Sequence, residues 1–137
     1  MSDAQHEAYS EYIRQLADQM ELRDWRFKTF IEVPSNPEWA ASCAITYGRR
    51  HACITINPST LTESPDDIRQ TIVHELVHCH TTPIRDQLDN VEEHLGKSAY
   101  TTIHNATTDV LELATEALAN AIAPFLPLPP DADEAAA

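Results

Sequence analysis

The chain has 137 residues, of which 42% are hydrophobic and 23% charged, values that fit one globular domain with a core of its own. Its formal net charge of −13 argues against a nucleic-acid partner, because a phosphate backbone is bound by clustered Lys and Arg. The amino-terminal residues lack the basic and apolar regions of a signal peptide, and no apolar run reaches the length of a membrane span. We therefore expect a cytoplasmic protein without a membrane contact.

The first half of the chain predicts one helix followed by three strands. An apolar stripe indicates an amphipathic helix over residues 3–24; it is formed by Tyr9, Ile13, Leu16, Met20 and Leu22. Alternation of apolar and polar residues predicts strands at 25–33, 40–47 and 51–57. The short turn between the last two strands predicts an antiparallel hairpin. Cys43 and Cys53 would then lie on neighbouring strands and could form a disulfide. Three unevenly spaced cysteines nevertheless favour free thiols.

The second half predicts two helices. Ser64 is a natural N-cap and Pro65 suits the first helical position, so a helix should begin here. It should end near residue 81, because Pro83 disfavours a helical conformation at the residue before it. A long helix is expected over 98–123, and residues 127–137 should form a disordered acidic, proline-rich tail. The expected buried side of the long helix comprises Val110, Leu113, Ala114, Ala117, Leu118, Ala121 and Ile122.

The motif His74-Glu75-Leu76-Val77-His78 lies within the first of these helices. Residues four apart share a helix face at about 5–6 Å, so the two imidazoles can converge on one Zn²⁺ ion. Glu75 is rotated by about 100° from His74 and would reach beside the metal without binding it. That placement suits a general base that takes a proton from water, so the motif predicts metal-assisted hydrolysis.

A catalytic zinc site usually has a third protein ligand, and the sequence offers several candidates. Glu112 and Glu116 lie one turn apart beside the apolar side of the last helix, so that one could bind the metal while the other orients a ligating histidine. The remaining candidates are weaker, because a surface or packing role explains each of them; they are His80, His94, His104, Asp109 and Cys79.

This motif, followed by a helix that carries a glutamate, resembles the gluzincin clan of thermolysin-like zinc peptidases. The layout over roughly residues 5–124 is similar to compact single-domain members encoded by bacteriophages and actinobacteria. The resemblance implies that His74, His78 and Glu112 bind zinc and that Glu116 supports a ligating histidine. The two glutamates could exchange these roles, because the N-E-x-x-S-D signature is absent.

The resemblance also implies how a substrate is held. Gluzincins bind an extended peptide along an edge strand of the sheet, here either 40–47 or 51–57. No second catalytic domain is present to stabilise the oxyanion, a role open to Tyr100 or His104.

We therefore expect an α+β, zincin-like domain over residues 1–126 that hydrolyses peptide bonds in a peptide or protein substrate. The alternative is a regulatory or protein-binding module with the same zinc site and little or no proteolytic activity. A closed zinc site with His104 as its fourth ligand would be catalytically inactive, because no coordination position remains for water. A helical interaction domain without a metal is a third possibility.

Overall fold

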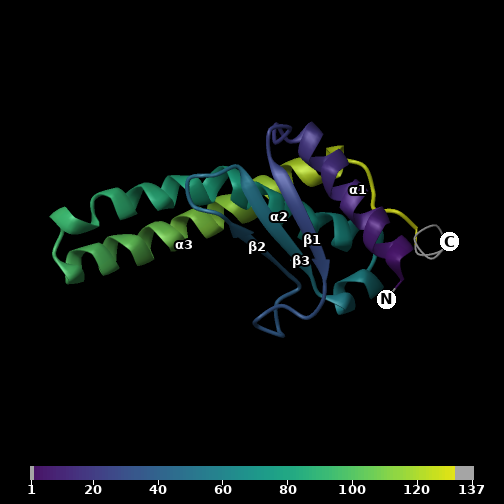
Figure 1. Ribbon diagram of the computed structural model, residues 1–137, viewed down its shortest axis with the longest axis horizontal. Helices are drawn as coiled ribbons and strands as arrows, with labels where there is room; N and C mark the ends of the chain where they lie inside the picture. The colour runs from purple at the N-terminus through teal and green to yellow at the C-terminus, as the bar shows by residue number, and fades with distance from the viewer. Residues whose placement is uncertain (1, 132–137) are drawn as a thin grey trace.

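The computed structural model describes residues 2–131, and within them the fold is α+β as expected (Figure 1). A helix precedes a small sheet, and two long helices follow it. The main elements are α1 (Asp3–Gln19), β1 (Arg26–Ile31), β2 (Ala41–Ile45), β3 (His51–Ile56), α2 (Pro65–Asp86) and α3 (Lys97–Ile122). Short 3₁₀ turns occupy Pro58–Thr62, Gln87–Asn90, Glu92–His94 and Ala123–Phe125.

The three strands form a mixed sheet in the order β1-β3-β2. β3 runs parallel to β1 and antiparallel to β2, so the predicted hairpin is confirmed and β2 lies at an edge. Cys43 lies opposite Ile54, whereas Cys53 lies opposite Ala44, which places the two cysteines on opposite faces of the sheet. A disulfide between them is therefore excluded, and all three cysteines are free thiols.

One face of the sheet is covered by α1 and α2, and the core lies between these layers. Ala52, Ile54 and Ile56 alternate along β3 and are all fully buried against both helices. α3 packs on α2 and continues with it beyond the sheet as an antiparallel pair (Figure 1). Within the described range, no helix combines the length and the apolar character needed to cross a membrane.

The chain after α3 returns to the amino-terminal helix. Arg69 on α2 donates to the carbonyl of Leu126 at 2.9 Å, and the Tyr12 hydroxyl donates to the carbonyl of Pro127 at 2.8 Å. Pro129 is buried. These contacts place the first part of the expected tail against the domain, whereas residues 132–137 lie outside the described residues and their disorder stays a prediction.

Two helix ends differ from the sequence-based expectation. α1 stops at Gln19 instead of residue 24, because Glu21 adopts a left-handed φ of 60° and the Leu22 N–H caps the carbonyl of Ala17 at 2.9 Å. α2 passes through Pro83 and ends at Asp86. A proline near the end of a helix removes only one backbone hydrogen bond, and the last turn of α2 still lies beside α3.

The expected buried side of α3 is wrong. Val110, Leu113 and Leu118 are 64%, 74% and 48% exposed, whereas Thr115 and Ala119 are fully buried. Small side chains at the contact let two helix backbones approach closely, and this geometry outweighs the burial of larger residues on the opposite side. The Thr115 hydroxyl lies 2.8 Å from that of Thr81, so a buried polar contact joins α3 to α2.

We predict that Thr115→Val lowers the free energy of unfolding by about 1–2 kcal/mol, because it removes the nearer partner of the buried Thr81 hydroxyl and leaves only the 3.4 Å contact with the Val77 carbonyl. The double variant with Thr81→Val should lose less than the sum of the two single changes, since neither hydroxyl is then left unpaired. Urea denaturation of all four proteins measures this coupling. Strict additivity would show that the two hydroxyls do not interact.

Candidate metal centre

α2 presents the two histidines of the motif toward β2 and α3. The N-cap of the helix is Ser64, whose side chain accepts a hydrogen bond from the Asp67 backbone N–H at 3.2 Å. Its opposite side is fully buried in the core, which fixes the rotation of the helix; this side includes Ile72, Val73 and Leu76. His74 and His78 consequently lie one turn apart with ring centroids separated by 5.0 Å.

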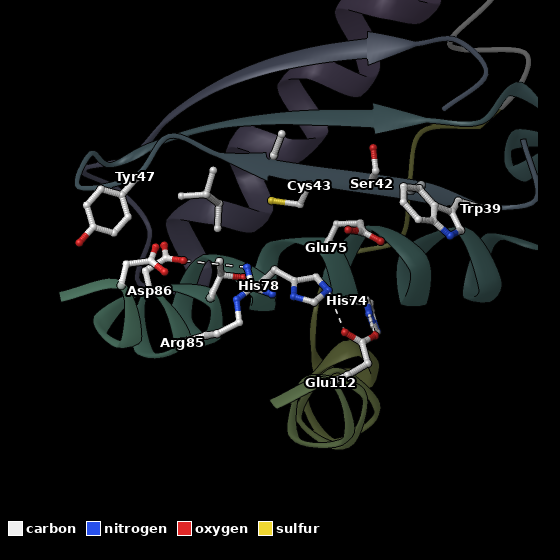
Figure 2. Close-up of a pocket in the computed structure, with 15 residues that line it drawn as sticks. Trp39, Ser42, Cys43, Tyr47, His74, Glu75, His78, Arg85, Asp86 and Glu112 are labelled. Atoms are coloured by element: carbon white, nitrogen blue, oxygen red, sulfur yellow. Dashed lines mark ion pairs between the residues drawn. The ribbon is translucent and has the colours of Figure 1, made fainter. Parts of the chain in front are cut away.

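α3 adds a carboxylate between the two rings (Figure 2). Glu112 Oε1 lies 3.0 Å from His74 Nε2, and Glu112 Oε2 lies 3.4 Å from His78 Nε2. One ligand atom from each of the three residues lies within 4.8 Å of the others. Donor atoms arranged tetrahedrally around Zn²⁺ are about 3.3 Å apart, so the spacing suits a small metal ion. The expected grouping of His74, His78 and Glu112 is therefore present in the structure.

Glu116, one turn after Glu112, contacts the other nitrogen of the first ring. The Nδ1–H of His74 donates to Glu116 Oε2 at 2.7 Å. In a neutral imidazole, a proton on Nδ1 leaves a lone pair on Nε2, which here faces the Glu112 carboxylate. Two electron-rich atoms at 3.0 Å repel each other unless a proton or a metal ion lies between them. The donor set thus fits a metal ion.

Burial of the His78 ring favours the neutral form of this imidazole, which is the form that binds a metal. It lowers the pKa of His78 below its ordinary value, although the nearby Glu112 carboxylate acts in the opposite direction. Only a neutral imidazole has a free lone pair, so a lowered pKa favours the form that binds metals.

Glu75 borders the same hollow as His74, His78 and Glu112 but is not one of the three residues whose ligand atoms converge. Its side chain is buried, and this burial raises its pKa to about 7, with a smaller contribution from Glu112 and an opposing one from His74. The hollow lies between β2 and α2 and has a volume of about 680 Å³. A carboxylate with a pKa near neutrality can both accept and release a proton, which is the requirement for a general base.

The other candidate residues lie away from this group. His94 is exposed and pairs with Glu93 at 3.2 Å, and His80 donates to the carbonyl of Met20 at 2.8 Å. His104 lies beside Tyr100, whose hydroxyl donates to Asp89 at 2.6 Å. Two further candidates do not join the group either, since Cys79 is buried in the core and Asp109 is exposed on α3.

Two residues that border the hollow were not found from the sequence. Trp39, 48% exposed, stands at one end, where its carbonyl accepts a hydrogen bond from the buried Asn57 side chain at 3.0 Å. Arg85 stands toward the other end (Figure 2). It was missed because the helix was expected to stop at residue 81, although its spacing of seven residues from His78 places both on one helix face.

Comparison with known proteins identifies one protein family. The model of that family, described as the SprT-like family, matches residues 10–117. These residues include the whole sheet, the motif helix and both glutamates of α3. Comparisons with curated proteins and with solved structures found no match.

We predict that the folding stability of the metal-free protein depends on pH through Glu75. Because the pKa of Glu75 is raised from 4.5 to about 7, the folded chain binds a proton in this window that the unfolded chain does not. Stability should therefore fall as pH rises through the window, and Glu75→Gln should abolish this loss, worth roughly 1–3 kcal/mol. Urea denaturation at pH 4 and pH 8 tests it. Identical pH dependence in both proteins would contradict the assigned environment of Glu75.

Proposed function

Because the chain belongs to the SprT-like family, a zinc-metalloprotease-like family, we propose that it is a zinc-dependent metallopeptidase. The observation that carries the proposal is the convergence of His74, His78 and Glu112 at the hollow between β2 and α2, which Glu75 also borders. The proposed substrate is a peptide or protein. The excess of acidic side chains opposes a nucleic-acid partner.

The proposed ligands are two imidazoles and one carboxylate, a set that suits Zn²⁺. Glu116 is the proposed supporting residue, since its hydrogen bond to Nδ1 of His74 directs Nε2 toward the metal. This arrangement of two motif histidines and a glutamate from a later helix supports the gluzincin type. When bound, the ion would polarise a peptide carbonyl and acidify a water molecule.

Glu75 is the proposed general base. It takes a proton from water as the oxygen of that water bonds to the peptide carbon, and it then passes this proton to the leaving amine as the C–N bond breaks. Its burial supports the role, because a raised pKa lets the protonated form persist until the amine departs.

The proposed peptide-binding edge is β2. β3 pairs on both sides, with β1 and with β2, so its backbone has no free edge. β2 pairs on one side only, and Ala41–Ile45 borders the hollow above α2 (Figure 2). A free strand edge offers backbone groups to an extended peptide, with little dependence on its sequence.

We predict that Glu75→Gln lowers kcat for cleavage of fluorescently labelled casein by at least about 100-fold, because the variant keeps the shape of the side chain but cannot accept a proton. Zinc content should stay unchanged, as measured by elemental mass spectrometry. Glu63→Gln, on an exposed loop residue, is the matched control and should keep full activity.

Two outcomes would contradict the proposal. Full activity in Glu75→Gln would exclude this mechanism. A wild-type protein that holds one zinc ion per chain but cleaves no peptide would instead indicate the protein-binding module with a zinc site.

A further inference from the structure

Apart from the two histidines of the motif, the ionisable side chains of Asp, Glu, Lys and Arg type that border the hollow are acidic with one exception. Among the described residues that border it, Arg85 alone carries a permanent positive charge. The bordering carboxylates are Glu75, Asp86, Asp89 and Glu112. The Arg85 guanidinium is therefore the one fixed positive charge among four carboxylates at this hollow.

The helix geometry directs this guanidinium toward the metal centre. Arg85 follows His78 by seven residues, so the two share a face of α2 with Thr82 between them. Helical side chains lean toward the amino-terminal end of the helix, which brings the end of the Arg85 side chain back toward His78 (Figure 2). Arg85, His78 and Glu112 also border a second, smaller hollow between α2 and α3.

The donors of Arg85 are largely unused. Its ion-pair contact is with Asp86 Oδ1 at 3.9 Å, a distance too long for a hydrogen bond. Its side chain is 32% exposed, and it forms no hydrogen bond to another residue of the described chain. A guanidinium carries five N–H donors in a planar fork, so Arg85 keeps donors available for a ligand in the hollow.

We propose that Arg85 is a catalytic residue that donates hydrogen bonds to the oxyanion of the tetrahedral intermediate. This inference rests on the peptidase function proposed above. As the water oxygen bonds to the peptide carbon, the π electron pair of the carbonyl moves onto its oxygen, which becomes negatively charged. Arginine holds its proton throughout, so it stabilises this charge without exchanging a proton.

The residues expected from the sequence to hold the oxyanion do not border the hollow. The Tyr100 hydroxyl already donates to Asp89, and this hydrogen bond raises the pKa of Tyr100 to about 12. His104 lies beside Tyr100 at a ring-centroid distance of 5.5 Å, on the carboxyl-terminal side of the α2–α3 connection. Arg85 therefore fills a role for which the other two candidates are poorly placed.

The test compares Arg85→Met and Arg85→Lys with the wild-type protein loaded with zinc. Arg85→Met should lower kcat by about 100-fold or more with KM within threefold, because the lost interaction forms only as the oxyanion develops. Arg85→Lys should recover part of kcat. Arg26→Met, an exposed position on β1, controls for the change in net charge and should behave as wild type.

A second readout does not depend on turnover. A peptide phosphonate mimics the tetrahedral anion, and calorimetry should show that Arg85→Met binds it about 100-fold more weakly. The affinity for the corresponding product peptide should change less than threefold. Zinc content should be the same in all four proteins.

The outcomes separate the inference from the proposed function. Unchanged kcat and unchanged phosphonate affinity in Arg85→Met would overturn the role of Arg85 while leaving the peptidase intact. A rise in KM confined to peptides with a carboxylate near the scissile bond would also overturn it, because Arg85 would then recognise the substrate. A wild-type protein without zinc or peptidase activity would refute the proposed function itself.

Discussion

The close approach of α3 to α2 is the interaction on which the candidate centre depends. The motif histidines belong to one helix, and the carboxylates that face them belong to the other. Thr115 and Ala119 are small enough for the two backbones to approach each other, and Thr115 lies between Glu112 and Glu116 in the sequence. A larger residue at this contact would move both glutamates away from His74 and His78 together. The position of α3 therefore sets the geometry of the centre.

Electrostatics suggest why a cation would stabilise this arrangement. The Glu112 carboxylate faces two imidazole nitrogens at 3.0 and 3.4 Å, and Glu75 is buried close by. The mutual repulsion of the two carboxylates contributes to the raised pKa of Glu75. A divalent ion would offset these charges, so metal binding and folding should reinforce each other. The proposed function of Arg85 follows the same logic, since a positive charge at the border of the hollow would offset the negative charge that the proposed reaction develops there.

Much of the fold follows from local sequence signals. Ser64, Pro65 and the apolar residues behind the motif predict a rigid helix, and the alternation in residues 51–57 predicts the buried face of β3. The order of the strands does not follow in this way, because the parallel pairing of β1 with β3 depends on contacts between distant parts of the chain.

The errors have definite physical causes. The largest apolar residues of α3 were expected to be buried, but a contact between two helices at close range selects small ones instead. Pro83 was expected to end α2, but near the end of the helix it removes a single hydrogen bond. The sequence also left Glu112 and Glu116 interchangeable. Only the rotation of α3 places Glu112 between both imidazoles and Glu116 behind His74.

The most direct test of the metal centre is the zinc affinity of the wild-type protein, Glu112→Ala and Glu116→Ala, measured by competition with a chelator. We expect one zinc ion per chain in the wild type, loss of stable binding in Glu112→Ala, and a roughly 10–100-fold weaker affinity in Glu116→Ala, because Glu116 acts through His74. Absence of zinc from the wild type after reconstitution, or unchanged affinity in Glu112→Ala, would contradict the assigned centre.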